Sequence, residues 1–324
     1  MSKPPAPIVI DKPGFYQIPA WRYHEDPCPA PSLSSSIAHE MLRHSPAHAR
    51  HAHPRLNPFF QRREPTSQMV DGTVLHWLMF DAGPEPLVVD ADSFRSAAAR
   101  KYQEQAAAEH RPCILWSRYQ KLRRVAAATR KQLRAFFDVP EAIADGFAEC
   151  TLVWREGDIW CRAMLDWQVP RPGLPIVDLK FTSKAAAAEP FARAVADNGY
   201  DIQWAWYRRG FRAVHGFDAA DLVFVTVETD PPYGVSVNGL GFGFQEIGEQ
   251  KVERAIELWS QCMKTGRWPG YPRRVGYVDA PAYASIQWQD QDARQVQQMR
   301  DAMRRPRRVE GPDVPRLIVE QGFG

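Results

Sequence analysis

The stretch from Ile159 to Lys180 constrains the fold more than any other part of the chain. It contains two short apolar segments, and each ends on an acid, Asp166 in the first and Asp178 in the second. A proline and a glycine between the segments are residues typical of a turn. The second segment also has the branched apolar character of a buried strand. The pattern therefore predicts a β-hairpin.

The hairpin would bring charged side chains together. Residues two apart in a strand project to the same face, so Asp178 and Lys180 should point together and Leu179 should point the opposite way. In a suitable register, Asp166 would lie beside Asp178, with facing positions about 5 Å apart. Two carboxylates held this close repel by about 4 kcal/mol at an effective dielectric of about 20. A cation or a proton between them is therefore expected.

A divalent metal ion meets this requirement. Mg²⁺ prefers hard oxygen ligands, retains several waters and accepts phosphate oxygens, which suits two Asp carboxylates. Lys180 would orient the attacking water or stabilise the negative charge that develops on phosphorus oxygens. The residues thus indicate metal-dependent hydrolysis of a phosphodiester. The alternative is an ordinary hairpin with an Asp and Lys pair on its surface.

Further motifs accompany the hairpin across most of residues 33–271. They are LSSSIAHEMLRHSPAHAR at 33–50, DGTVLHWLMF at 71–80, CRAMLDW at 161–167, IVDLKFTSKA at 176–185, GYDIQWAWYRRGF at 199–211 and WPGY at 268–271. In this set the chain resembles the PD-(D/E)XK nuclease superfamily, and within it the RecE-like, exonuclease VIII branch, which degrades the 5′ strand of duplex DNA. The resemblance implies an α/β fold with a central mixed β-sheet flanked by α-helices.

The resemblance also implies a set of metal ligands. Asp166 and Asp178 would bind Mg²⁺, with Mn²⁺ as the alternative ion, and His76 of a G-T-x-x-H pattern would complete the shell. The backbone carbonyl of Leu179 is a further candidate ligand. Lys180 would activate the water.

Three more residues are candidates for the same site. Gln203 and Tyr207 are four residues apart in a predicted helix, so they share one face. The resemblance places this pair at the border of the active centre, with Gln203 as a catalytic residue that holds water or phosphate and Tyr207 in contact with the DNA backbone. Glu149, on the strand before the hairpin, is an accessory candidate, and a charge at a strand edge is the alternative interpretation.

The net charge of +3 is slight for an enzyme that acts on nucleic acid. DNA affinity should therefore come from local basic patches. Candidates are Arg123 and Arg124 in one predicted helix and the pair Arg208 and Arg209 in another. A further basic cluster near the tail contains Arg304, Arg305, Arg307 and Arg308. Solvated helix faces or a disordered tail are the alternative interpretation of these charges.

Composition and the resemblance together predict three regions. Residues 1–32 are rich in proline and are expected to be irregular, residues 33–286 should form the nuclease domain, and residues 287–324 should be a polar, basic tail. Within the domain, residues 92–137 are rich in helix formers and should form a helical layer divided at Pro112. The five cysteines are scattered without a C-x-x-C motif, which argues against a zinc ribbon or a disulfide framework. No apolar run of membrane-spanning length and no signal peptide are evident, so we expect a cytoplasmic protein without a membrane partner.

The resemblance predicts an exodeoxyribonuclease that resects linear duplex DNA from its 5′ ends. No G-x-x-x-x-G-K-[ST] motif is present, so the activity should be independent of ATP. The 3′ single strands would serve a single-strand annealing protein in phage-type recombination, and the enzyme would form a homo-oligomeric ring at double-stranded DNA ends. Two alternatives remain open: an endonuclease with the same site, and a DNA-binding protein that retains the fold without catalysis.

Overall fold

The computed structural model describes residues 9–62, 64–136 and 146–304 of the chain. The chain consists of two compact units, Met1–Tyr271 and Pro272–Gly324. Within the described ranges, no helix has both the length and the apolar character needed to cross a bilayer. Three arginines of the predicted basic tail cluster lie outside the described residues, namely Arg305, Arg307 and Arg308.

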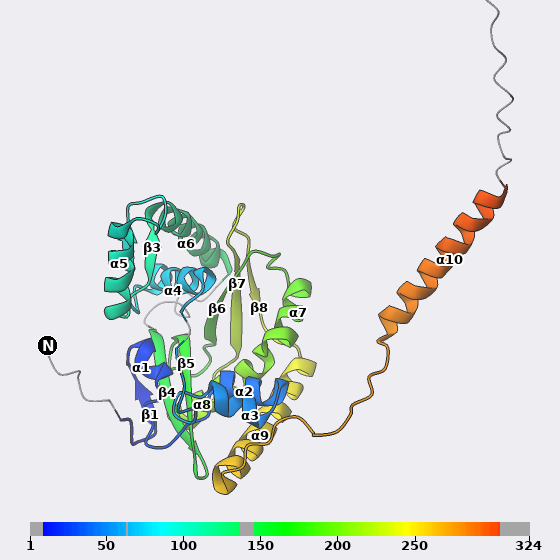
Figure 1. Ribbon diagram of the computed structural model, residues 1–324. Coiled ribbons are helices and arrows are strands. Elements are labelled where there is room, and N and C mark those ends of the chain that lie inside the picture. The colour runs from blue at the N-terminus through cyan, green and yellow to red at the C-terminus, as the bar shows by residue number, and fades with distance from the viewer. Residues whose placement is uncertain (1–8, 63, 137–145, 305–324) are drawn as a thin grey trace, which may run out of the picture. The chain divides into compact units, whose positions relative to one another are not determined.

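Within the described part of the first unit, a six-stranded sheet has the order β1-β4-β5-β6-β7-β8 (Figure 1). Neighbouring strands run antiparallel except β6 and β7, which run parallel. A parallel pair needs a crossover connection, and α7 and α8 provide it. The strands are β1 (Gly14–Tyr16), β4 (Phe147–Glu156), β5 (Ile159–Gln168), β6 (Ile176–Thr182), β7 (Leu222–Glu228) and β8 (Val235–Asn238).

Helices cover both faces of this sheet because its side chains alternate between two apolar clusters. On β6, Ile176 packs with one cluster, whereas Val177 and Leu179 pack with the other. The first cluster includes residues of α2 (Ser35–Arg43), α3 (Pro46–Ala52), α7 (Ala188–Asn198), α8 (Tyr200–His215) and α9 (Phe242–Thr265). The second includes residues of α4 (Ser67–Phe80) and α6 (Trp116–Phe136). The predicted fold class, a mixed sheet flanked by helices, is confirmed.

The predicted hairpin is present as β5 and β6. Trp167 pairs with Val177 in an antiparallel ladder, and continuation of this register sets Asp166 opposite Asp178. The connection is a seven-residue loop, longer than a tight turn, in which Gly173 has a φ of 86°. The parallel ladder with β7 then fixes β6 along its length.

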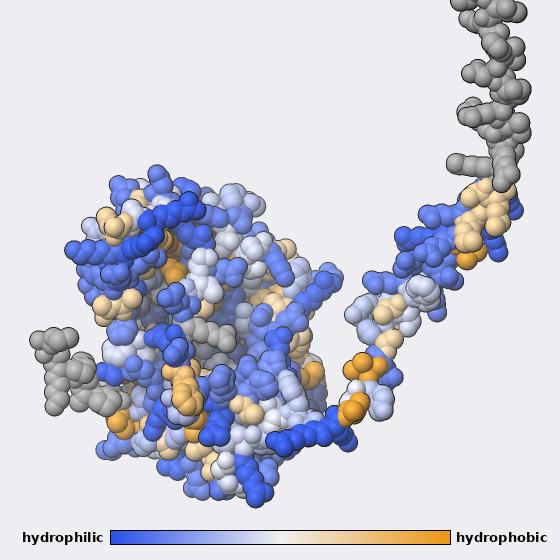
Figure 2. Space-filling view, viewed as in Figure 1, coloured by the Kyte–Doolittle hydropathy of each residue, from blue (hydrophilic) through white to orange (hydrophobic). Residues whose placement is uncertain are grey.

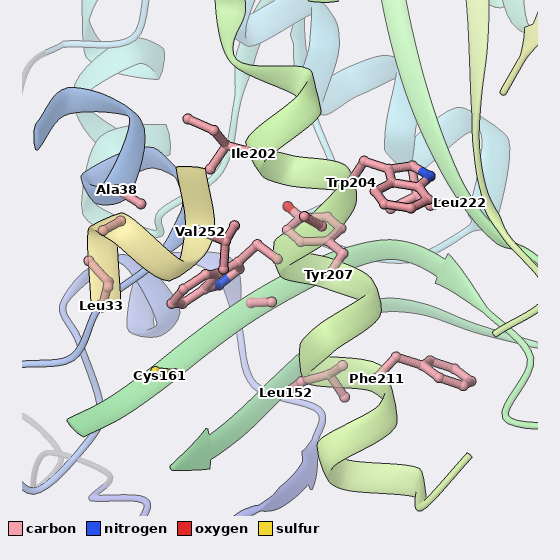
Figure 3. Packing of buried hydrophobic residues seen from close by; sticks show 14 of the residues in the cluster. Leu33, Ala38, Leu152, Cys161, Ile202, Trp204, Tyr207, Phe211, Leu222 and Val252 are labelled. Atoms are coloured by element: carbon pink, nitrogen blue, oxygen red, sulfur yellow. The ribbon is translucent and has the colours of Figure 1, made fainter. Parts of the chain in front are cut away.

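Helix α8 crosses β4 and β5 between the sheet and the helices α2 and α9 (Figure 3). The indole of Trp206 donates a hydrogen bond to the carbonyl of Arg162 on β5 (2.9 Å), and Trp204 donates to Asp221 before β7 (2.9 Å). On the outer side, Gly248 of α9 packs directly against the carbonyl of Asp201. These contacts fix the rotation of α8 and hence the direction of its remaining side chains.

The segment expected to be irregular contains regular structure. Strand β1 extends the sheet by pairing with β4, and α1 (Ala20–His24) follows it. Asp26 is buried next to Arg162 of β5 (3.2 Å) and His53 (3.3 Å), and its carboxylate also accepts a hydrogen bond from the Ser32 amide (2.9 Å). Composition predicted an irregular segment because it does not reveal partners as distant in sequence as Arg162 and His53.

Residues 92–137 also contain more than the expected helices. Between α5 (Ala97–Ala108) and α6, strand β3 (Cys113–Leu115) begins directly after Pro112 and pairs in parallel with β2 (Leu87–Val89). The apolar side chain of Ile114 is buried there. In the second unit, α10 (Ala282–Arg304) spans the position 286/287 at which the sequence predicts the end of the nuclease domain.

Replacing Gly248 by Ala should destabilise the first unit. The added Cβ would lie 2.4 Å from the carbonyl oxygen of Asp201, so α8 and α9 would have to separate. Overpacking of this kind costs about 1–3 kcal/mol of unfolding free energy, which urea denaturation measures. Gly243→Ala in the same helix is the matched control, because nothing lies within 4 Å of its Cβ position. Equal effects of the two substitutions would contradict close packing at Gly248.

Candidate active site

Two carboxylates lie at the junction of β5 and β6. Asp178 is almost fully buried, whereas the Asp166 side chain is 18% exposed. The backbone amide of Leu179 donates a hydrogen bond to Asp166 Oδ2 (2.7 Å), which ties the first acid to the strand that carries the second. The predicted approach of Asp166 to Asp178 is therefore present in the structure.

Lys180 and Gln203 both contact Asp178. The Lys180 ammonium forms an ion pair with Asp178 Oδ1, as expected for residues two apart in a strand. From α8, the Gln203 amide donates a hydrogen bond to Asp178 Oδ2 (2.5 Å). The structure thus brings together residues from β5, β6 and α8.

His76 reaches the same centre from α4. This helix begins at the cap residue Thr66, whose hydroxyl accepts a hydrogen bond from Met69, and it buries Val74 and Leu75. The imidazole Nε2 lies 3.6 Å from Asp166 Oδ2. Burial lowers the pKa of His76 to about 4. The imidazole is therefore neutral near pH 7 and keeps a lone pair for a metal ion or a proton.

Burial also shifts the pKa values of the two acids. It raises the pKa of Asp166 and of Asp178 from 3.8 to about 6, and for Asp178 the neighbouring Asp166 adds to the rise. Burial alone would lower the pKa of Lys180, but the Asp178 and Asp166 carboxylates more than offset this and hold it above its usual value. The ionised centre therefore contains two negative charges and one positive charge, and a bound cation would stabilise it further.

Glu149 lies across from Asp166 at an irregularity in the ladder. Its neighbours Ala148 and Cys150 pair with Trp167 and Leu165, while Glu149 has a positive φ of 47°. Its carboxylate fits against Gly83, where a Cβ would lie 2.6 Å from Oε2. Burial, followed by the charge of Asp166, raises the pKa of Glu149 from 4.5 to about 7. The structure thus brings this predicted accessory residue toward the carboxylates.

Tyr207 follows Gln203 by one turn of α8 and is 8% exposed. Burial, and then the charges of Asp178 and Asp166, raise the pKa of Tyr207 well above its usual value. The phenol therefore remains protonated at neutral pH. As predicted, Gln203 and Tyr207 share the face of α8 that is turned toward the carboxylates.

The structure does not bring Arg208 and Arg209 to the carboxylates. Arg209 forms two hydrogen bonds with Glu156 (2.6 and 2.9 Å), at the end of β4 opposite to Glu149. The two glutamates are seven positions apart along β4, a length of about 23 Å. Arg208 lies over the ring of Trp204, with its guanidinium carbon 4.5 Å from the ring centroid. These arginines therefore have partners within the fold.

Arg123 and Arg124 are exposed on α6. Other basic residues of this helix are engaged: Arg118 forms an ion pair with Asp71, and Lys121 does so with Asp230 (2.7 Å). The predicted DNA contacts Arg123 and Arg124 are therefore exposed outside these ion pairs, and Lys131 and Arg134 of the same helix are exposed as well.

The donor set of the centre fits a hard divalent cation, although no three His, Cys, Asp or Glu side chains among the described residues are close enough to hold a metal ion. Asp178 Oδ1 is buried, and the Lys180 ammonium is its partner. The two carboxylates are oxygen ligands of the kind that Mg²⁺ and Mn²⁺ prefer, and the neutral imidazole is a nitrogen donor beside them. Asp166, Asp178 and His76, with the predicted Leu179 carbonyl, are the residues that would hold the ion.

A family model described as "PDDEXK-like domain of unknown function (DUF3799)" matches residues 36–281, well over half of the chain. The chain belongs to this PDDEXK-like family. Asp178, Leu179 and Lys180 read D-x-K in this sequence and Asp166 is the acid before them, and their assignment to the family's motif remains a prediction. The predicted superfamily is therefore confirmed, and the RecE-like branch remains a prediction.

A solved structure shares the fold of this PDDEXK-like protein. It is a chain from Eubacterium rectale described as a "Putative exonuclease", and it aligns with a TM-score of 0.50 and 12% sequence identity. The alignment covers 82% of this chain and 97% of that chain. No curated protein matches the sequence. The structural neighbour supports the fold, and the match to a PDDEXK-like family supports a nuclease.

Sequence reasoning missed two residues next to the centre. Gly83 provides the space that the Glu149 carboxylate fills, and Tyr200 lies beneath the Lys180 ammonium. A glycine just after a helix resembles an ordinary helix end, so only the close approach reveals the role of Gly83. One signal in the sequence could have identified Tyr200: it lies three residues before Gln203 and hence on the same side of α8.

Glu149→Gln should stabilise the folded protein increasingly as pH rises from 4.5 to about 7. The folded state binds the Glu149 proton more tightly than the unfolded chain, so the wild type loses stability through this window, and the variant does not. Each unit of pKa difference corresponds to about 1.4 kcal/mol. Urea denaturation in EDTA at a series of pH values measures the effect. Glu104→Gln at an exposed position of α5 is the control, and a stability difference that is independent of pH would contradict the prediction.

Proposed function

We propose that the protein is a metal-dependent, ATP-independent exodeoxyribonuclease that degrades linear double-stranded DNA from its 5′ ends. The observation that carries this proposal is the convergence of Asp166, Asp178, Lys180, Gln203 and His76 on one centre. The family match to a PDDEXK-like domain supports the nuclease chemistry. The 3′ single strands would be used by a single-strand annealing protein in recombination.

Asp166, Asp178 and His76 would hold Mg²⁺ or Mn²⁺, with the Leu179 carbonyl as a further ligand. The bound ion would supply Lewis acidity to the scissile phosphate and lower the pKa of a water. The burial of Asp178 and its contact with Gln203 keep this carboxylate in one orientation. Preorganisation of this kind is a main source of catalysis at charged transition states.

Lys180 contributes a positive charge that persists through the reaction, since its pKa is held above the usual value. The ammonium would hydrogen-bond the attacking water or a phosphate oxygen, on which negative charge grows as water attacks phosphorus. The P–O bond to the leaving oxygen breaks as the new P–O bond forms. Tyr207, on the same face of α8, is a protonated phenol at neutral pH and would donate to the DNA backbone.

Two surface features support a binding place for the DNA substrate. The space-filling view shows the first unit hollowed between the part formed by α4, α5 and α6 and the part formed by α2, α8 and α9 (Figure 2). Exposed arginines of α6, Arg123 and Arg124, are candidates for phosphate contacts. A homo-oligomeric ring at the DNA end, as in the branch that the sequence resembles, would keep the substrate engaged between cleavage events.

Digestion of duplex DNA tests the proposal directly. Linear DNA labelled separately at its 5′ and 3′ ends is incubated with the protein and Mg²⁺ or EDTA, beside a closed circular substrate. We expect metal-dependent loss of the linear substrate from its 5′ ends and an intact circle. Cleavage of the circle would indicate an endonuclease, and absence of cleavage of either substrate would indicate a DNA-binding role.

Asp178→Asn should reduce the cleavage rate by about a thousandfold, equivalent to about 4 kcal/mol of transition-state stabilisation. The substitution removes a metal-binding charge but keeps the size of the side chain. Circular dichroism should show an unchanged fold. Asp158→Asn is the control, since the Asp158 side chain is 88% exposed in the β4–β5 turn. Cleavage at the wild-type rate by the Asp178 variant would remove this residue from the mechanism.

Arg123→Gln combined with Arg124→Gln should weaken DNA binding for all sequences alike. If each arginine contacts one phosphate, the slope of log K against log salt should decrease by about 0.9 per residue. Fluorescence anisotropy in EDTA over a salt series measures the slope without cleavage. Arg209→Gln serves as the comparison, because Arg209 is already paired with Glu156 and its loss should leave the slope nearly unchanged. Equal slopes in all three proteins would exclude α6 from the DNA interface.

A further inference from the structure

The Lys180 ammonium lies over an aromatic surface. Its Nζ is 4.7 Å from the ring centroid of Tyr200 and 5.7 Å from that of Phe224. Tyr200 is the first residue of α8, and Phe224 lies on β7 directly beside Asp178 in the parallel ladder. The amine therefore has two kinds of neighbour, a carboxylate and aromatic rings.

The ring of Tyr200 is itself held in place. It stacks on Phe224 with centroids 5.6 Å apart and on Phe191 of α7 with centroids 5.9 Å apart. Both phenylalanines are buried. Gly199, with a φ of 69°, joins α7 to α8 and lies against the ring of His39, where a Cβ would be 2.5 Å from an atom of the imidazole. This helix junction places Tyr200 beneath Lys180.

We propose that Tyr200 is a positioning residue, whose ring holds the Lys180 ammonium beside Asp178 by a cation–π interaction. This inference rests on the proposed nuclease function and adds a residue to its site. A lysine has a long, flexible stem, and the Asp178 contact fixes only its end. The aromatic face restricts the other directions in which the Lys180 side chain could turn, so the amine stays close to where the scissile phosphate would bind.

The ring, and not the hydroxyl, carries this role. No hydrogen bond of the Tyr200 hydroxyl occurs to any of the residues that the structure describes. Burial raises the pKa of Tyr200, so the ring remains a neutral phenol near pH 7. Phenylalanine at this position would keep the aromatic face, whereas leucine would keep apolar volume and remove the attraction to the cation.

Steady-state kinetics of DNA cleavage provide the first test. Tyr200→Leu should lower kcat by roughly tenfold with KM nearly unchanged, whereas Tyr200→Phe should stay within about threefold of the wild type. Tyr102→Leu, at an exposed position of α5, is the matched control for a Tyr to Leu change. Equal losses in the Phe and Leu variants would assign the role to the hydroxyl and overturn the proposal.

A second measurement does not depend on nuclease activity. Sulfosuccinimidyl acetate acetylates accessible amines, and peptide mass spectrometry compares Lys180 with the exposed Lys101 as internal reference. Tyr200→Leu should raise the relative rate at Lys180 by about threefold or more, and Tyr200→Phe should leave it near the wild-type value. Unchanged acetylation in the Leu variant would overturn the positioning role. If the wild type cleaved no DNA, the proposed function would fail, and the acetylation ratio would still decide the role of Tyr200.

Discussion

The site depends on the burial of two carboxylates side by side. Asp166 and Asp178 meet because β5 and β6 pair in the register that sets Trp167 opposite Val177. Charges in such a position are unfavourable unless the surroundings provide compensating groups. The fold supplies them from separate elements: the Leu179 amide to Asp166, and Lys180 and Gln203 to Asp178. Removing any of these groups would leave a buried oxygen without its partner.

This requirement explains why the site is assembled from the centre of the sheet. The parallel ladder with β7 anchors β6 along its length, and α8 is fixed in rotation by Trp204 and Trp206. Each polar contact of Asp178 is therefore supported by a buried apolar framework. The burial that shapes the framework also raises the pKa values of both acids and lowers that of His76. The packing of this region therefore also sets the protonation of the two acids and the histidine.

Much of this arrangement could be predicted from sequence because the decisive patterns are local. The alternation of a strand set Asp178 and Lys180 on one face, and helical spacing set Gln203 and Tyr207 on another. What could not be predicted depends on distant partners. The buried contacts of Asp26, the pairing of Arg209 with Glu156 and the backbone irregularity at Glu149 are each decided by residues elsewhere in the chain. The strand and helix periodicities of the sequence carry no information about such contacts.

The contact between the N-terminal segment and β5 bears on the order of assembly. The Arg162 guanidinium donates a hydrogen bond to the carbonyl of Ser32, 130 residues away, and it also pairs with Asp26. During synthesis, Asp26 can pair with Arg162 only after β5 has been made. Closing so long a loop is entropically costly, and such contacts slow folding. Arg162 and Asp166 belong to the same strand, so the docking of this early segment and the assembly of the carboxylate pair both require β5.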